Sequence, residues 1–147
     1  MSRPKINRSV LKPPMFTEFK PVGVPSRILS QTFLSLDEYE AFRLADHLGF
    51  GHEEASEEMN ISRSTFTRLI EQARKKVAGM LINGNILTIE GGNIHFRKNT
   101  IRCNSCGHTF IIDINANIVK CPECNSDSLQ NFAGNFGHGR CCRGRNR

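Results

Sequence analysis

The sequence of 147 residues predicts a mainly α helix-turn-helix domain, followed by a β-hairpin and a small β zinc-ribbon module. Apolar residues recur at helical spacing between Leu34 and Leu81, and β-branched residues flank a glycine pair at 91–92. Two Cys-x-x-Cys pairs follow at 103–124. The predicted domains are a basic Pro-rich arm at 1–29, the helix-turn-helix domain at 30–85, a hairpin connector at 86–100, the zinc ribbon at 101–130 and a flexible basic Cys-containing tail at 131–147.

Charge is distributed unevenly along the chain, which has a net charge of +6. Residues 30–61 carry eight acidic side chains and one basic side chain, whereas residues 62–102 carry eight basic and two acidic side chains. A basic excess favours an anionic partner, and here it begins at Ser62, where the longest helix is expected to start.

The arm at 1–29 contains five prolines, which exclude a long helix. Six of its side chains are basic and one is acidic. Two interpretations stay open: a loosely docked or disordered segment, or an arm that follows DNA phosphates or the minor groove.

The first helix is predicted to begin after Ser35, because Ser35 and Glu38 can form a capping box. Gly49 and Gly51 are expected to end it. A second, short helix should extend from about His52 to Met59. It carries four glutamates, which are poor neighbours for phosphate, so they either point away from DNA or meet a protein such as RNA polymerase.

The turn after Met59 is expected to place Asn60 in the left-handed region, which Asn tolerates better than most residues. Ser62 should then cap a helix that continues to about Ile82. Such an arrangement is typical of a helix-turn-helix whose second helix enters the major groove of double-stranded DNA. The candidate DNA-binding residues are Arg63, Ser64, Thr65, Thr67, Arg68, Arg74 and Lys75. An ordinary solvated helix surface is the alternative for this face.

Three segments of the chain, Phe19–Pro25, Leu36–Asp46 and Ser62–Phe66, resemble the family catalogued as domain of unknown function 134. The resemblance covers roughly residues 15–92. It implies a helix-turn-helix similar to region four of sigma-70 factors, and a protein that is predicted to bind DNA. Ser56 stands where such motifs usually carry Ala, a small departure from the pattern.

Residues 86–97 are expected to form a β-hairpin, with strands at Ile86–Glu90 and Asn93–Arg97 around Gly91–Gly92. A hairpin this short is marginal alone, so it should pack on a neighbouring element.

Cys103, Cys106, Cys121 and Cys124 form two pairs separated by fourteen residues. Four thiolates can close a tetrahedral site around a structural Zn²⁺ ion. Strands are expected between the pairs at 109–113 and 117–120. Rubredoxin-type iron and a redox Cys-x-x-Cys are the alternatives, while catalytic zinc would need an open coordination position. His108 is expected to be a surface or packing residue.

The tail contains His138, Cys141 and Cys142, with arginines around the two thiols. Neighbouring cations lower the pKa of a thiol, so these three residues form a candidate redox or metal sensor. The alternative is a flexible basic tail whose thiols are incidental.

Together these patterns predict a transcriptional regulator that binds double-stranded DNA, with homodimerisation as an open question because helix-turn-helix proteins often dimerise. A zinc-ribbon adaptor that binds RNA or a protein of the transcription machinery is the alternative, and a rubredoxin-like electron carrier is a third. No Gly-rich phosphate loop or nucleophile with a paired base is visible, so we do not expect an enzyme. Without a signal peptide or a membrane-spanning run, the chain is expected to be cytoplasmic, with no membrane partner.

Overall fold

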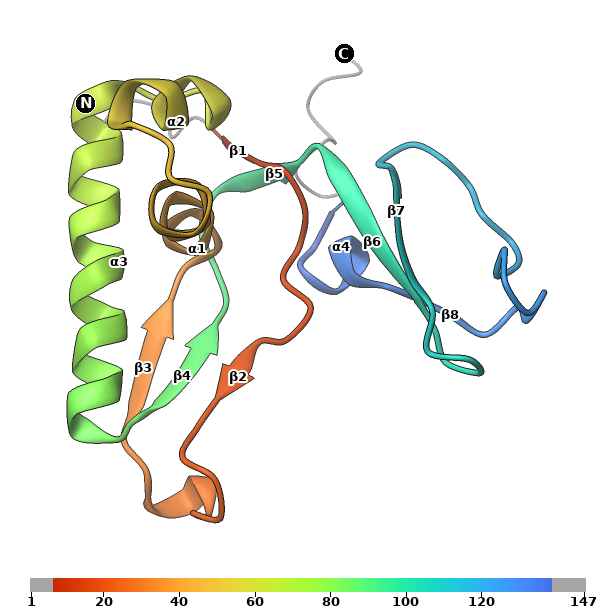
Figure 1. Cartoon of the computed structure of the whole chain (residues 1–147), viewed down its shortest axis with the longest axis horizontal. Helices are drawn as coiled ribbons and strands as arrows, with labels where there is room; N and C mark the ends of the chain where they lie inside the picture. Colours follow the sequence, from red (N-terminus) through yellow and green to blue (C-terminus); the bar gives the residue numbers. More distant parts are fainter. Residues whose placement is uncertain (1–6, 139–147) are drawn as a thin grey trace. The chain divides into compact units, whose positions relative to one another are not determined.

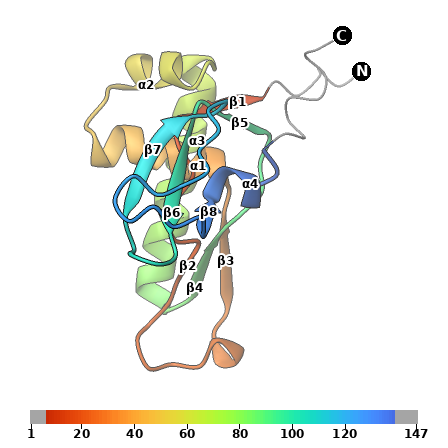
Figure 2. The ribbon, with the colours of Figure 1, turned by 90° about the vertical axis from the view of Figure 1, so that its right-hand side faces the viewer.

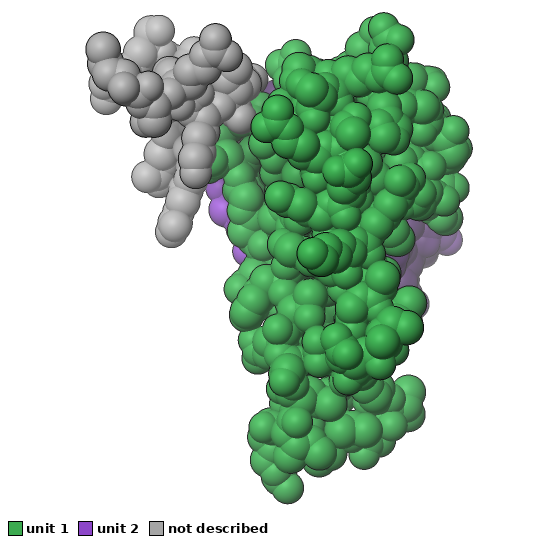
Figure 3. Space-filling view, turned by 90° about the vertical axis from the view of Figure 1, so that its left-hand side faces the viewer, with its two compact units in different colours: residues 1–9, 16–94 green, residues 10–15, 95–147 purple. Residues whose placement is uncertain are grey.

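A computed structural model of the chain describes residues 7–138 (Figure 1). These residues form two compact units: unit 1 comprises residues 7–9 and 16–94, and unit 2 comprises residues 10–15 and 95–138 (Figure 3). Helices account for 36% of the described residues and strands for 23%. The predicted mainly α class is therefore wrong, because a sheet accompanies the helices in unit 1.

The sheet of unit 1 has the strand order β2-β4-β3 within the described part of the chain. Its strands are β2 (Glu18–Phe19), β3 (Gln31–Leu34) and β4 (Ile86–Ile89), with the short 3₁₀ helix η1 (Ser26–Ile28) between the first two. β4 is antiparallel to β2 and parallel to β3. A parallel pair needs a long crossover, and the helices between β3 and β4 supply it.

The predicted hairpin over 86–97 does not form. β4 belongs to the sheet described above, whereas β5 (Ile94–Phe96) pairs with β1 (Arg8–Val10). In the segment between β4 and β5, the Gly91 carbonyl accepts a hydrogen bond of 3.0 Å from the Leu36 amide. A Cβ atom on Gly92 would lie 2.9 Å from a carboxylate oxygen of Asp37. The glycine pair therefore allows a close approach to a helix N-terminus instead of a chain reversal.

The first helix, α1 (Leu36–Phe42), continues directly into the π-helical turn η2 (Arg43–His47). The predicted capping box is confirmed: the Glu38 amide donates to Ser35 Oγ at 3.4 Å, and the Ser35 amide donates to Glu38 Oε1 at 3.0 Å. Gly49 follows this segment with a φ of +79°, as expected for a residue that ends a helix.

The helix-turn-helix consists of α2 (His52–Glu58) and α3 (Arg63–Asn83). In the turn between them, Asn60 has the predicted left-handed conformation, with a φ of +57°. Ser62 Oγ accepts from the Thr65 amide at 3.2 Å and caps α3. α2 lies across the N-terminal end of α3 (Figure 1).

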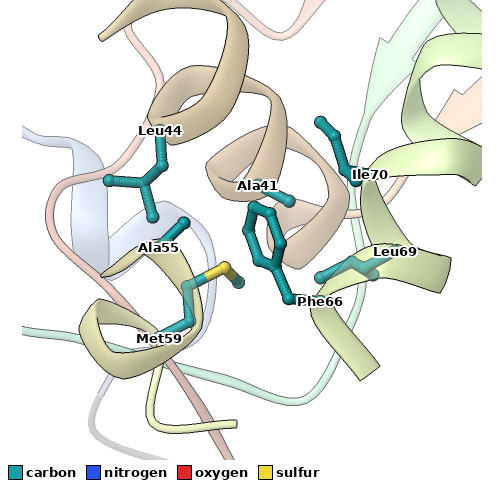
Figure 4. Close-up of a cluster of buried hydrophobic side chains, with 7 residues drawn as sticks. All are labelled: Ala41, Leu44, Ala55, Met59, Phe66, Leu69 and Ile70. Atoms are coloured by element: carbon teal, nitrogen blue, oxygen red, sulfur yellow. The ribbon is translucent and has the colours of Figure 1, made fainter. Parts of the chain in front are cut away.

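A cluster of buried side chains joins these helices, with Phe66 pointing into its centre (Figure 4). The small side chains of Ala41 and Ala55 allow the helices to approach each other closely. The buried Ser56 hydroxyl donates to the Glu53 carbonyl at 2.7 Å, so a hydroxyl is tolerated where Ala is usual. The members of the cluster are Ala41, Leu44, Ala55, Met59, Phe66, Leu69 and Ile70.

Three acidic side chains at the start of α1 are also buried, and each has a basic partner within unit 1. Asp37 pairs with Arg8, Glu38 with Lys76, and Glu40 with Arg43. Buried charges are tolerated only when they are paired and hydrogen-bonded, so these contacts define the position of α1 as well as stabilising it.

Unit 2 contains a sheet of order β7-β6-β8 in its described residues, with both pairs antiparallel (Figure 2). Its elements are β6 (Lys98–Cys103), β7 (Thr109–Asp113), β8 (Leu129–Asn131) and the short helix α4 (Phe132–Asn135). The predicted strand at 109–113 is confirmed. The strand predicted at 117–120 is wrong, because β7 pairs with β6 and residues 117–120 are not extended in any sheet.

Candidate metal centre and nucleic-acid interface

The sheet of unit 2 brings the two cysteine pairs together. Cys103 is the last residue of β6 and lies opposite Leu129, the first residue of β8. The first pair begins at the last residue of β6 and the second pair precedes β8 in the chain, so antiparallel pairing places both at the same end of the sheet. The strand β6 is therefore the element that assembles the centre.

The two cysteine pairs adopt the same turn. The Gly107 amide donates to the Cys103 carbonyl at 2.9 Å, and the Asn125 amide donates to the Cys121 carbonyl at 2.9 Å. Gly107 has a φ of +77° and Asn125 a φ of +60°. Gly and Asn are the residues that adopt this left-handed conformation most readily, so each turn depends on the residue directly after its second cysteine.

The four sulfur atoms fit a tetrahedral metal ion. All four lie within 4.8 Å of one another, with Cys103 Sγ 3.5 Å from Cys124 Sγ and Cys106 Sγ 3.7 Å from Cys121 Sγ. A zinc–sulfur bond of about 2.3 Å in a tetrahedron separates the sulfur atoms by about 3.8 Å. The four cysteines can therefore hold a metal ion without rearrangement of the chain.

Backbone amides and neighbouring sulfurs make the four thiols unequal. Hydrogen bonds from the amides of Cys106 and Ser105 lower the pKa of the Cys103 thiol to about 6. The Ser126 amide lowers the pKa of Cys124, but the Cys103 sulfur and burial outweigh it and raise that pKa to about 12. Negative charge accumulates unfavourably when several thiolates lie together, and a bound cation removes that repulsion.

Contacts that do not involve the sulfur atoms also connect the turns of the two cysteine pairs. Ser105 Oγ lies 2.8 Å from Ser126 Oγ, and the Asn104 amide donates to the Ser128 carbonyl at 2.9 Å. Sequence reasoning did not identify this support, because Ser and Asn in a loop are too common to indicate it. The His108 ring stacks on Phe110, with ring centroids 5.5 Å apart, as a packing residue does.

On α3, five of the predicted DNA-binding side chains are exposed: Arg63, Ser64, Arg68, Arg74 and Lys75. At 100° per residue, Ser64, Arg68 and Lys75 share the face opposite the buried stripe that contains Phe66 and Ile70. Arg63 and Arg74 lie at the edge of that stripe, on the side of Ile70. The other two predicted residues, Thr65 and Thr67, are half-buried. The Thr65 hydroxyl lies 2.7 Å from Ser62 Oγ, and the Thr67 hydroxyl lies 2.8 Å from Nδ1 of His52.

The contact between His52 and Thr67 joins the two helices of the motif. The His52 ring also packs edge-on against Phe66, with centroids 5.4 Å apart. His52 therefore aligns the first turns of α3 with α2. No pattern in the sequence pointed to this role, since a lone histidine at a helix start is not informative.

Arg74 is engaged within unit 1. Its guanidinium donates to both carboxylate oxygens of Asp46, at 2.9 and 2.8 Å. These hydrogen bonds hold the pKa of Asp46 below its ordinary value. Two of the five N–H donors of Arg74 are used in this way, so the others are available to an anion.

The model of the family described as protein of unknown function DUF134 matches residues 1–97. The chain belongs to the DUF134 family. The match extends over the helix-turn-helix and ends before the first of the four cysteines, so family membership by itself does not account for the metal centre.

Relatives of this DUF134 protein occur in several bacteria. A UPF0251 protein of Chloroherpeton thalassium is 46% identical over 150 residues, which cover 100% of this chain and 99% of the relative. A UPF0251 protein of Pelotomaculum thermopropionicum is 44% identical, covering 86% of this chain and 95% of the relative. A UPF0251 protein of Moorella thermoacetica is 40% identical, covering 97% and 94%. No solved structure matches the chain.

The remaining predicted site residues lie near the C-terminus. His138 is described and half-buried, whereas Cys141 and Cys142 lie outside the described residues. Between residues 7 and 138, no helix has both the length and the apolar character needed to cross a membrane.

Proposed function

We propose that unit 1 binds double-stranded DNA by inserting the N-terminal half of α3 into the major groove, and that the protein regulates transcription. The observation that carries this proposal is the joined α2–turn–α3 motif. Its tight turn at Asn60 and its shared core around Phe66 leave the first turns of α3 exposed on one side. A helix presented in this way has the size and polarity that the major groove accepts.

Base contacts in this proposal come from the exposed residues on the first two turns. Arg63 and Arg68 each offer a planar guanidinium that can donate to both acceptor atoms of guanine. Ser64 is less selective, because a hydroxyl both donates and accepts. Arg74 and Lys75 lie farther along the helix and would contact phosphates, which position a protein on DNA without reading its sequence.

Acidic side chains on α2 restrict how DNA can approach. All four glutamates of this helix are exposed, and carboxylates close to phosphates would weaken binding. We therefore orient the motif with this surface away from the phosphates and available to a basic protein partner, for which RNA polymerase is the candidate. The residues are Glu53, Glu54, Glu57 and Glu58.

The four-cysteine centre has a structural role in this proposal. Four sulfur ligands fill a tetrahedral coordination shell, which leaves no position for a substrate or an activated water. We propose zinc as the ion, because it accepts four thiolates without redox chemistry, and we propose no enzymatic activity.

A second candidate function is suggested by the surface of unit 2. Ile111 and Val119, two large aliphatic side chains of this unit, are 55% and 73% exposed. They favour a protein partner for unit 2, which would then act as an adaptor. This function is compatible with DNA binding by unit 1.

The decisive experiment is selection of bound sequences from a random duplex DNA pool with the zinc-loaded full-length chain at about 0.15 M salt, where non-specific binding is weak. We expect an enriched motif. The Arg68→Ala variant should bind that motif about 1–3 kcal/mol more weakly and lose selectivity at one position.

The matched variant is Arg74→Ala, which removes the same charge from the same helix. It should weaken binding to all sequences alike and flatten the salt dependence. Binding without an enriched motif, or equal effects of both variants on selectivity, would refute the proposed mode of DNA recognition. A palindromic motif would additionally indicate a homodimer.

A further inference from the structure

One edge of the sheet in unit 1 is formed by β2, which the proposed DNA interface does not use. Among the described residues, β2 has β4 as its one hydrogen-bonded neighbour, and β4 lies between β2 and β3 (Figure 1). A strand at the edge of a sheet presents amides and carbonyls that can pair with a strand of another chain. The side chains of Phe16, Glu18, Phe19 and Lys20, in and around β2, are all exposed.

The hydrogen bonds between β2 and β4 identify the backbone groups on the free side of β2. The Thr17 carbonyl accepts from the Ile89 amide at 2.7 Å, so the backbone of Thr17 is directed toward β4. In an antiparallel strand this direction alternates from one residue to the next. Phe19 is therefore also directed toward β4, whereas Glu18 and Lys20 direct two amides and two carbonyls away from it.

The charges on this edge complement the same edge of a second copy. Glu18 and Lys20 flank Phe19 and place their side chains on one face of the sheet, because they are two residues apart. In an antiparallel pair of β2 strands with Phe19 on the two-fold axis, Glu18 of each copy lies directly opposite Lys20 of the other. Cβ atoms of such residues are about 4.5–5.5 Å apart, within the reach of an ion pair. The outward amides and carbonyls of the same two residues would form the hydrogen bonds.

Lys20 and Pro21 do not oppose this pairing, although lysine and proline commonly protect an edge strand. Lys20 would lie opposite a carboxylate instead of another lysine. Pro21 follows the same alternation as Phe19, so its missing N–H faces β4 and removes no outward donor. The Lys20 ammonium donates to the Val24 carbonyl at 2.7 Å, which uses one of its three donors and leaves two for a carboxylate.

The same two-fold axis brings exposed apolar side chains together. Phe19 is 47% exposed and would face Phe19 of the second copy, in a non-hydrogen-bonded pair whose Cα atoms are about 4.5 Å apart. Aromatic pairs across neighbouring strands are stabilising. Phe16 and Val22 are 60% and 100% exposed and stand three positions before and after Phe19, so each approaches the other residue in the second copy. Polar and apolar groups of this edge are therefore arranged for the same symmetric contact.

We propose that two copies of this chain form a homodimer by antiparallel pairing of their β2 edges, which joins the sheets of the two copies of unit 1 into one continuous sheet. This contact is isologous and closes with two copies, whereas β2 on the β3 edge of another copy would continue into an open chain. The paired segment is short, so the dimer should dissociate on dilution. The proposal does not depend on DNA binding by α3.

The test is sedimentation velocity of the zinc-loaded full-length chain over a dilution series, with a reductant present so that no intermolecular disulfide contributes. We expect a reversible monomer–dimer equilibrium. Glu18→Lys and Lys20→Glu each place like charges opposite one another at both ion pairs and should raise the dissociation constant by about tenfold or more. The matched control is Glu71→Lys, which makes the same charge change at an exposed side chain of α3 and should leave the dissociation constant unchanged.

The decisive variant is the double exchange Glu18→Lys/Lys20→Glu, which has the composition of the wild type with the two charges exchanged. Its dimer should recover, because each carboxylate again lies opposite an ammonium group. A mixture of the two single variants should form heterodimers for the same reason. An unchanged far-ultraviolet spectrum establishes that each variant is folded.

Hydrogen exchange tests the backbone contacts separately. The amides of Glu18 and Lys20 should gain protection as the protein concentration rises, whereas protection of the Phe19 amide, which is directed toward β4, should not change. A wild type that stays monomeric throughout the series would overturn the proposal. So would single variants that dimerise like the wild type, or a double variant and a mixture that both stay monomeric.

Discussion

The two units of this protein are stabilised in different ways. Unit 1 has a contiguous apolar cluster centred on Phe66, and its buried carboxylates are paired with basic side chains. Unit 2 is built around β6, whose end carries a group of four sulfurs, two of them buried. Apolar packing is intrinsic to the chain, whereas a group of thiols becomes stabilising only when an ion joins them. The folding of unit 2 should therefore depend on metal, and the folding of unit 1 should not.

Metal removal should have the largest effect and should be confined to unit 2. Structural zinc contributes on the order of 10 kcal/mol to small domains, so a chelator, or the variant Cys121→Ser, should unfold the ribbon. Hydrogen exchange should show loss of protection at the amides of β6 and β7 while the middle of α3 stays protected. Loss of protection in α3 to the same extent would contradict the independence of unit 1.

Removal of the Phe66 ring should destabilise unit 1 and leave metal binding by unit 2 unchanged. Phe66→Ala should destabilise unit 1 by about 3–5 kcal/mol, because the ring lies at the centre of the apolar cluster and leaves a cavity. Denaturation followed by α-helical circular dichroism measures this effect. Metal content should be unchanged, and Phe66→Leu, which fills part of the cavity, should cost less. A Phe66→Ala protein that also loses its metal would show that the two units fold together.

Breaking the buried ion pair between Glu38 and Lys76 should cost less free energy of unfolding than Phe66→Ala. The cost should depend on which partner of the pair is replaced. The carboxylate side chain of Glu38 is 4% exposed and the side chain of Lys76 is 39% exposed. Lys76→Gln leaves a buried charge with a weaker partner and should cost about 2–3 kcal/mol. Glu38→Gln leaves a cation that can reach water and should cost about 1–2 kcal/mol. A larger loss from Glu38→Gln in chemical denaturation would refute this ordering.

The comparison also explains which features were predictable from the sequence. The capping box at Ser35, the left-handed turn at Asn60 and the cap at Ser62 involve residues within four positions of one another, so the local sequence specifies them. The cysteine turns are equally local, and their spacing predicted the four cysteines whose sulfur atoms lie within 4.8 Å of one another.

Strand pairing was predicted less well, because it depends on residues far apart in the chain. Phe19 lies opposite Leu87, and no local pattern indicates that contact. Ile118 and Val119 favour a strand by propensity, but β6 is already paired with β7 on one side and β8 on the other. Gly91 and Gly92 resemble a hairpin turn, yet their use is a close approach to α1, which only the tertiary structure defines.

The smallest effect is expected at the ion pair between Asp46 and Arg74, whose side chains are 33% and 47% exposed. Asp46→Asn should cost unit 1 only about 0.2–1 kcal/mol, because solvent screens a surface pair even when it is bidentate. Since the Arg74 hydrogen bond lowers the pKa of Asp46, the contribution is complete above about pH 4 and is lost as the pH falls through the lowered pKa. Chemical denaturation of both proteins over a series of pH values from 7 downwards measures this, and their free energies of unfolding should draw closer as the pH falls through that pKa. A cost of 2 kcal/mol or more, or a difference that persists in acid, would mean that this pair belongs with the buried pairs of α1 and that Arg74 is a structural residue of unit 1 rather than a contact available to DNA.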